Sequence, residues 1–321
     1  MTALCDPPAA VDLRRRVDEL RRERNAVILA HNYQLPEIQD VADVVGDSLG
    51  LSQAAARTDA DVIAFCGVHF MAETAAILSP QRVVLLPDLA AGCSLADTIT
   101  PAQLRAWKAE HPGAVVVSYV NTSAAVKAES DYCCTSANAA EIVRRIPEET
   151  EVLFCPDMFL GEHVRRVTGR RNMHVWMGEC HVHAGIDPED LEAARATDPD
   201  AELLVHPECG CTTSALYRAA NGELGACTVT STEGMMARAA ASPASTFIVA
   251  TEVGIIHRLA AQNPRKRFVP ASRDAVCRFM KMITLEKLVH SLETMSPRVT
   301  VDEATASRAR AAIDRMIGVA A

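Results

Sequence analysis

Three segments of the chain open with the same pattern, a short apolar run that ends in two polar residues. The two polar residues stand two positions apart, and the pairs are His31 with Tyr33, Tyr119 with Asn121, and His206 with Glu208. Continuous apolar runs followed by alanine-rich stretches are typical of buried parallel strands joined by helices. Side chains at i and i+2 of a strand lie on one face. Each pair should therefore project together from the end of its strand.

The same three segments share two later landmarks. Each has a hydroxyl residue at the start of a helix-like stretch (Ser48, Ser136, Thr232) and, further on, a cysteine after a short strand (Cys93, Cys180, Cys277). The hydroxyl-to-cysteine intervals are 93 − 48 = 45, 180 − 136 = 44 and 277 − 232 = 45 residues. The first residues of the polar pairs are 119 − 31 = 88 and 206 − 119 = 87 residues apart. This agreement predicts an internal repeat.

The repeat predicts an α/β fold of three pseudo-symmetric, three-layer αβα subdomains around a common centre. We divide the chain into an N-terminal helix (1–25), three repeats (26–110, 111–200 and 201–290) and a C-terminal helical segment (291–321). The third repeat carries an insertion, placed at 209–226. Apolar spacing predicts outer helices over Asp12–Asn25, Met280–Leu292 and Ala304–Ile317.

The hydroxyl residues Ser48, Ser136 and Thr232 have two interpretations. A hydroxyl at a helix start can cap the helix by accepting a bond from a free backbone N–H. It can also help the helix N-terminus to bind an anion, since the helix dipole favours negative charge there. The sequence leaves both interpretations open.

Composition narrows the function classes. The chain has 321 residues, 49% of them hydrophobic, and a formal net charge of −9. Covering a phosphate backbone needs a basic face, so nucleic acid is not expected as a partner. Apolar stretches are interrupted by polar residues, so no membrane span is expected. We expect a cytoplasmic protein.

The eleven cysteines are many for a cytoplasmic enzyme, and their odd number rules out complete pairing within the chain. Three equivalent cysteines can ligate an iron–sulfur cluster and leave one iron open as a Lewis acid. Zinc is the rival metal, because Cys180-His-Val-His183 and His206-Pro-Glu-Cys-Gly-Cys211 also offer ligands. The alternative without metal is that the cysteines are small apolar residues buried in the core.

The cysteines in and directly after the insertion, Cys209, Cys211 and Cys227, are interpreted as framework residues. A redox-active pair of Cys209 and Cys211 is the alternative. The polar pairs are candidate general acids and bases, since His, Tyr and Glu perform this work in many enzymes.

Longer motifs resemble the quinolinate synthase family, in order from Val27 to Leu292. They are Ala30-His-Asn-Tyr-Gln34, Gly46-Asp-Ser48, Phe65-Cys-Gly-Val-His-Phe-Met-Ala-Glu73, Leu86-Pro-Asp88, Ala91-Gly-Cys-Ser94, Tyr119-Val-Asn-Thr122, Cys134-Thr-Ser136, His206-Pro-Glu-Cys209, Thr251-Glu-Val-Gly254 and Asp274-Ala-Val-Cys277. His181 and Arg278-Phe279 depart from the family pattern, in which we expect Pro, and Pro-Asn. Such neighbours alter the surroundings of a cluster but leave its ligands in place.

The resemblance implies a central [4Fe–4S] cluster with three ligands, Cys93, Cys180 and Cys277, and one open iron. It implies condensation of iminoaspartate, supplied by aspartate oxidase, with dihydroxyacetone phosphate to quinolinate, with loss of phosphate and water, in NAD biosynthesis. The substrate-binding positions would be His31, Ser48, Tyr119, Asn121, Ser136, His206, Glu208 and Thr232. Proton transfer would fall to Tyr33, Glu208 and His206.

Two other functions remain compatible with the residues themselves. One is a hydro-lyase that acts on a different carboxylate substrate. The other is a zinc-stabilised binding or redox-sensing protein without catalysis. The sequence leaves open whether the chain is a monomer or a homodimer.

Overall fold

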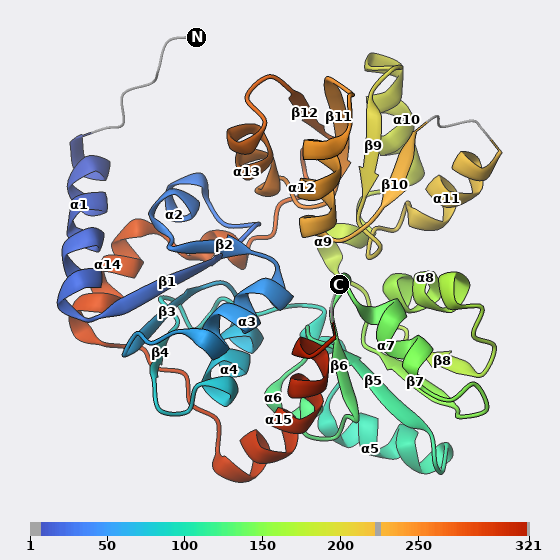
Figure 1. Ribbon diagram of the computed structural model, residues 1–321, viewed down its shortest axis with the longest axis horizontal. Coiled ribbons are helices and arrows are strands. Elements are labelled where there is room, and N and C mark those ends of the chain that lie inside the picture. The colour runs from blue at the N-terminus through green and yellow to red at the C-terminus, as the bar shows by residue number, and fades with distance from the viewer. Residues whose placement is uncertain (1–7, 222–225, 320–321) are drawn as a thin grey trace.

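The strands in the described part of the chain form three separate parallel sheets of four strands each, arranged around a common centre (Figure 1). The structure is a computed structural model that describes residues 8–221 and 226–319. Residues 1–7, 222–225 and 320–321 lie outside this description. They include parts of the predicted N-terminal segment, third-repeat insertion and C-terminal segment.

All three sheets have the same topology. The first contains β1 (Ala26–His31), β2 (Val44–Gly46), β3 (Val62–Cys66) and β4 (Val83–Leu85), in the order β2-β1-β3-β4. The second repeats this order with β5 (Val115–Tyr119), β6 (Tyr132–Cys134), β7 (Val152–Cys155) and β8 (Met173–Val175). The third does so with β9 (Glu202–Val205), β10 (Cys227–Val229), β11 (Thr246–Ala250) and β12 (Arg267–Pro270). The prediction of three α/β units from an internal repeat is confirmed.

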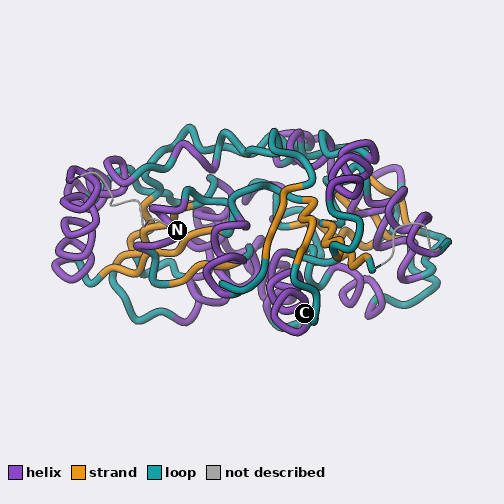
Figure 2. The backbone as a smooth tube through the Cα atoms, turned by 90° about the horizontal axis from the view of Figure 1, so that it is seen from above, coloured by secondary structure: helices purple, strands orange, loops and turns teal. Residues whose placement is uncertain are grey.

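Helices connect the strands, as parallel pairing requires. In the first sheet these are α2 (Pro36–Val41), α3 (Ser48–Arg57) and α4 (His69–Leu78). In the second they are α6 (Ala124–Lys127), α7 (Ala139–Arg145) and α8 (Met158–Thr168), and in the third α11 (Thr212–Ala220), α12 (Thr232–Ala241) and α13 (Ile255–Gln262). Seen from above, the strands run between outer helices and loops (Figure 2).

The central strands are buried because helices cover both faces of each sheet. Every residue of β3 and β7 is buried. One phenylalanine from the third strand of each sheet is almost fully buried, namely Phe65, Phe154 and Phe247. Such continuous burial explains why these strands have apolar runs instead of an alternating pattern.

The insertion of the third repeat lengthens the first connection of its sheet. Helix α11 has nine residues, whereas the equivalent α2 has six and α6 has four. The extra length lies between β9 and β10, away from the last two strands of the sheet. The order of the strands is therefore unchanged.

Short helices and the terminal helices fill the spaces between and around the sheets. Those between sheets are η1 (Ala96–Thr98), α5 (Pro101–Glu110), α9 (His181–Ala184) and α10 (Pro188–Thr197). Helix α1 (Pro8–Glu23) packs against α14 (Leu285–Thr294) on the first sheet, and α15 (Glu303–Ile317) packs against β6, α6 and α4. Helix α15 thus joins the first two repeats.

The single helix expected over Met280–Leu292 is wrong, because two helices occupy this segment. A short turn, η2 (Met280–Met282), ends before Ile283, and α14 begins at Leu285. The hydroxyl of Thr284 accepts a hydrogen bond from the backbone N–H of Lys287 and so caps the new helix. In the described part of the chain, no helix has both the length and the apolar character to cross a membrane.

Truncation of Ile313 should destabilise the protein, because its side chain on α15 is fully buried. We expect Ile313→Ala to lower the free energy of unfolding by about 2–5 kcal/mol through lost burial and a residual cavity. Urea unfolding of the purified variant measures this loss. Ser307→Ala, at an exposed position of the same helix, is the control and should change it by less than about 0.5 kcal/mol. If Ile313→Ala and Ser307→Ala lowered the free energy of unfolding equally, α15 would not be packed as described.

Candidate functional site

The polar pairs lie where the first strand of each sheet ends. His31 is the last residue of β1 and Tyr119 the last of β5, while His206 directly follows β9. One cavity lies at these carboxyl ends, where ligands of open α/β sheets bind. It is lined by every predicted site residue: His31, Tyr33, Ser48, Cys93, Tyr119, Asn121, Ser136, Cys180, His206, Glu208, Thr232 and Cys277. The structure thus brings together all the candidates from three repeats.

The hydroxyls of Ser48 and Thr232 do not cap their helices, because the preceding residue does so. The carboxylate of Asp47 accepts a hydrogen bond from Gly50 N at 2.8 Å, and the hydroxyl of Ser231 accepts one from Gly234 N at 3.3 Å. Ser48 and Thr232 are instead the first residues of α3 and α12. The capping interpretation is therefore wrong for these two residues, and it is also wrong for Ser136, because Asn138 holds the N-cap position of α7. All three residues line the cavity.

Each candidate ligand cysteine precedes a short helical turn. Cys180 is the residue before α9, while Cys93 and Cys277 each precede a 3₁₀ turn by three residues. Two backbone N–H groups of the turn point at each sulfur. They belong to Leu95 and Ala96, to Val182 and His183, and to Phe279 and Met280. The repeat therefore reproduces the hydrogen-bonded surroundings of the sulfur as well as the cysteine.

Burial keeps the three thiols protonated when no cation is near. It raises the pKa of Cys93 to about 12, and it raises the pKa of Cys180 and Cys277 as well. Negative charge on Cys93 and Cys180 would add to this effect by mutual repulsion. A metal cation reverses the balance, since it binds the thiolate. Three convergent free thiols with amide donors fit the ligand set of an iron–sulfur cluster.

A buried ion pair holds the third cysteine. Glu252 is fully buried, and its Oε1 accepts hydrogen bonds from Cys277 N and from Lys281 Nζ, both at 3.0 Å. Its Oε2 accepts from Gly254 N at 2.7 Å. Lys281 also donates to the carbonyl oxygen of Tyr33. The pair thus links the Cys277 loop of the third repeat to the Tyr33 turn of the first.

The two histidines of the polar pairs are oriented in the same way. Tyr33 N donates to His31 Nδ1 at 3.2 Å, and Glu208 N donates to His206 Nδ1 at 3.4 Å. A neutral ring that accepts at Nδ1 carries its proton on Nε2. His206 Nε2 lies 3.2 Å from the hydroxyl of Ser136. Burial lowers the pKa of both histidines, that of His31 to about 3, so both are neutral donors near neutral pH.

The carboxyl group of Glu208 lies at the centre of the polar network. Its Oε1 accepts a short hydrogen bond from the hydroxyl of Tyr119, and its Oε2 lies 3.5 Å from His183 Nδ1. Burial raises the pKa of Glu208 to about 7, against the opposing effect of the Tyr119 hydrogen bond. A carboxyl group with such a pKa can both accept and release a proton near neutral pH.

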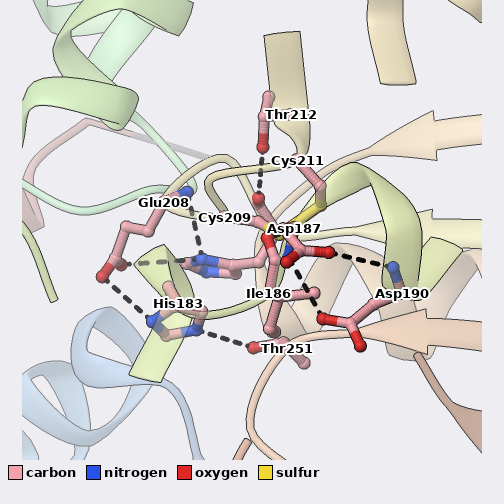
Figure 3. The surroundings of a disulfide bond; sticks show 10 residues. His183, Ile186, Asp187, Asp190, Glu208, Cys209, Cys211, Thr212 and Thr251 are labelled. Carbon is pink, nitrogen blue, oxygen red and sulfur yellow. Dashed lines mark hydrogen bonds and ion pairs between the residues drawn. A yellow bond between two sulfur atoms is a disulfide. The ribbon is translucent and has the colours of Figure 1, made fainter. Parts of the chain in front are cut away.

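His183 and Thr251 complete this network, and sequence reasoning did not assign them a role in proton transfer. His183 Nε2 lies 2.9 Å from Thr251 Oγ1 (Figure 3). The hydroxyl of Tyr33 lies 2.6 Å from Thr251 Oγ1. The hydroxyl of Tyr33 also lies 3.3 Å from His183 Nε2. Thr251 directly follows β11, the neighbour of β9 in the sheet. The adjacency of these two strand ends was the signal that could have identified Thr251.

The predicted zinc ligands are only partly available. Donor atoms of Cys180, His183 and Glu208 lie within 4.8 Å of one another, so this group could hold an ion. Cys209 and Cys211 are instead joined in a buried disulfide beside Glu208 (Figure 3). The zinc alternative therefore loses these two thiols.

Residues that follow the three cysteines form part of the cavity wall. His181 Nδ1 lies 2.6 Å from the hydroxyl of Ser94, and the rings of His181 and Phe279 are 6.0 Å apart, edge to face. Two of the three residues that depart from the family pattern, His181 and Phe279, therefore contact each other across repeats. Among the described residues that line the cavity, none is Lys or Arg.

The chain is similar to known proteins over most of its length. Residues 15–318 match the family described as Quinolinate synthetase A protein. Curated quinolinate synthases from Mycobacterium sp. (strain KMS) and Thermus thermophilus are 59% and 58% identical, over 94% and 96% of this chain and 90% and 97% of the relative. The quinolinate synthase of Mycobacterium tuberculosis (strain H37Ra) is 57% identical over 97% of this chain and 88% of its own.

Substitution of Asp47 should change how stability depends on pH. Burial raises the pKa of this carboxyl from 3.8 to about 6, and Glu233 adds to the effect while Gly50 N and Arg258 oppose it. Because folded Asp47 keeps its proton to a higher pH than the unfolded chain, wild-type stability falls as pH rises through this range. Asp47→Asn should lack this loss, which is at most about 3 kcal/mol. Urea unfolding at pH 4.5 and 7.5 measures it.

Asp302→Asn is the matched control at an exposed helix start. Its hydrogen bond from Thr305 N lowers the pKa of Asp302, so its contribution to stability is lost as pH falls. The two variants should differ from the wild type with opposite pH trends. A constant difference for Asp47→Asn at both pH values would contradict the burial described for it.

Proposed function

The chain belongs to the quinolinate synthetase A family, and from this premise we propose that its central cavity is the active site of a quinolinate synthase. The activity and its place in NAD biosynthesis follow from the family and from relatives at 57–59% identity. The observation that carries the assignment of the site is the convergence of three free thiols and a His–Tyr–Glu network in one cavity.

We assign to this cavity the condensation of iminoaspartate with dihydroxyacetone phosphate, with release of phosphate and water. Both substrates are small and anionic, and the cavity offers them several neutral hydrogen-bond donors. The hydroxyls of Ser48 and Thr232 come from the first residues of α3 and α12, and that of Ser136 comes from the turn before α7. Helix N-termini favour carboxylate and phosphate groups. Three donors on three repeats suit a ligand with more than one anionic group.

Cys93, Cys180 and Cys277 would hold the iron–sulfur cluster. This assignment is supported because three unpaired thiols line one cavity and each faces two backbone N–H groups, an arrangement that fits a cluster. When bound, a [4Fe–4S] cluster with three protein ligands supplies one open iron as a Lewis acid for a substrate oxygen. The Glu252–Lys281 pair would keep the Cys277 loop in position.

Tyr33 and Glu208 are the two ends of a proton relay. A chain of hydroxyl and ring atoms leads from Tyr33 through Thr251 and His183 to the carboxyl group of Glu208. Its links are 2.6, 2.9 and 3.5 Å long. The last link exceeds a normal hydrogen bond, and such contacts often tighten when substrate binds. The relay would let one site remove a proton from carbon and later protonate a leaving hydroxyl.

Tyr119, Asn121, His31 and His206 would position the substrate around this relay. Tyr119 already donates to Glu208, and His206 faces Ser136. The amide oxygen of Asn121 is buried without a hydrogen-bond partner, which suits a group that awaits a ligand. The proposal also includes aspartate oxidase as the source of the unstable imine. It places the protein in a reducing cytoplasm, which suits the eight free thiols among the described residues.

Serine at a ligand position should remove the cluster. Cys93→Ser, Cys180→Ser and Cys277→Ser, each purified without oxygen, should lose most bound iron and sulfide and all quinolinate formation. Iron and sulfide analysis and the anaerobic quinolinate assay measure these losses. Cys227→Ser, a free cysteine outside the cavity, is the control and should keep both. Loss of the cluster in the control, or its retention in a ligand variant, would refute the ligand set.

Removal of the Tyr33 hydroxyl should stop catalysis without loss of the cluster. We expect Tyr33→Phe to lower kcat by about 10²–10⁴-fold, the usual range for a general acid or base, while iron content and the visible spectrum stay normal. Tyr217→Phe, at a tyrosine that is 66% exposed, should leave kcat unchanged. Turnover by Tyr33→Phe within about twofold of wild type would remove Tyr33 from the relay.

A further inference from the structure

A second group of possible metal ligands lies outside the cavity, in the second repeat. It contains His111, Glu151 and His174, whose ligand atoms all lie within 4.8 Å of one another. Only one other group of this kind occurs among the described residues, the Cys180, His183 and Glu208 group of the cavity. The activity proposed for the cavity requires no role for the outer group.

The three side chains come from separate elements. His111 follows α5, Glu151 precedes β7, and His174 lies in β8. The backbone around them is fixed by the sheet, because Val115 N donates to Glu151 O at 2.8 Å and His174 pairs with Leu153. Three rigid elements thus hold the donors in place before any ion binds, which reduces the entropic cost of binding.

Both histidines face the same carboxylate oxygen. His111 Nδ1 lies 3.2 Å and His174 Nε2 2.6 Å from Glu151 Oε1, and the two rings are 4.3 Å apart. A tetrahedral zinc ion with bonds of about 2.0–2.1 Å places neighbouring ligand atoms about 3.3 Å apart. The 3.2 Å distance between His111 Nδ1 and Glu151 Oε1 already suits such an ion. The 2.6 Å distance between His174 Nε2 and Glu151 Oε1 must increase by less than about 1 Å.

Solvent access and ligand type also suit a metal ion. The side chains of His111, Glu151 and His174 are 21%, 36% and 44% exposed, so an ion can enter and keep water as a further ligand. Two imidazole nitrogens and one carboxylate oxygen form a common ligand set for zinc and related divalent ions. Elsewhere, His257 contacts Asp40 and His69 contacts Glu73, and each of these contacts brings together a single histidine and a single acid.

We propose that His111, Glu151 and His174 bind one divalent transition-metal ion of the zinc class. The ion would tie the end of α5 to the starts of β7 and β8. The site lies at the amino ends of the strands, whereas the cavity lies at their carboxyl ends, roughly one strand length of 13 Å away for the four residues of β7. Its role is therefore to stabilise the second repeat and not to act on substrate.

The two tryptophans of the chain provide a local signal for this site. The ring of Trp107 lies 6.3 Å from that of His111 and 5.5 Å from that of Trp176. An ion such as Ni²⁺ that quenches tryptophan fluorescence should report binding here. Binding of metal to the thiols of the cavity can be followed separately, through the visible spectrum of the cluster.

The test is anaerobic titration of the cluster-loaded protein with Ni²⁺ while tryptophan fluorescence is recorded. We expect saturable quenching by one equivalent in the wild type, and at least tenfold weaker binding in His174→Ala and Glu151→Gln. His257→Ala, which removes the histidine of a contact with a single acid, is the control and should bind like the wild type. Zn²⁺ should also raise Tm in the wild type and not in the two site variants.

Equal midpoints of the Ni²⁺ titration in the wild type and both site variants would overturn the proposal. A wild-type titration that does not saturate below roughly 1 mM Ni²⁺, the range of weak surface binding, would also overturn it. Circular dichroism checks that the variants fold, and His174→Gln replaces His174→Ala if the latter does not. The readouts are fluorescence and Tm, so failure of this proposal is distinct from failure of the active-site assignment. Quinolinate formation should change less than twofold in the site variants.

Discussion

The carboxyl group of Glu208 is buried at the point where the three repeats meet, and its need for partners constrains everything around it. It is 2% exposed, and a buried ionised carboxylate is costly unless hydrogen bonds replace its water. The hydroxyl of Tyr119 from the second sheet and the ring of His183 beyond it approach its two oxygens. These contacts form only if the second and third sheets present their strand ends to each other. The cavity is thus a consequence of how the repeats pack.

The three repeats place their backbones at equivalent positions around the cavity. Different residues at these positions provide the different acid and base groups. His31 and His206 occupy the same place in their repeats, and each accepts the backbone N–H of the residue two positions on. That residue is Tyr33 in one repeat and Glu208 in the other. The same backbone turn therefore presents a phenol at one side of the cavity and a carboxyl group at the other. A symmetric scaffold holds an asymmetric set of acids and bases.

The repeat could be predicted because its landmarks recur in the sequence, and the contacts between repeats could not. Equal spacing identified Ser48, Ser136 and Thr232, but it could not show that the neighbours Asp47 and Ser231 cap the helices. His183 and Thr251 are 68 residues apart, and neither is one of the landmarks by which the repeat was identified. Their contact arises from the packing of α9 against the end of β11. Tertiary geometry, not local pattern, decides such contacts.

The described cavity wall has no cationic side chain, and this affects the protonation of Glu208. An arginine or lysine beside Glu208 would favour the ionised form and lower the pKa of its carboxyl. Lys281 is nearby, but it pairs with Glu252 and donates to the carbonyl of Tyr33. The histidines are neutral because burial lowers their pKa. Glu208 therefore keeps a pKa of about 7. Hydroxyls, imidazole N–H groups and helix starts are the donors that remain for the anionic substrates we propose.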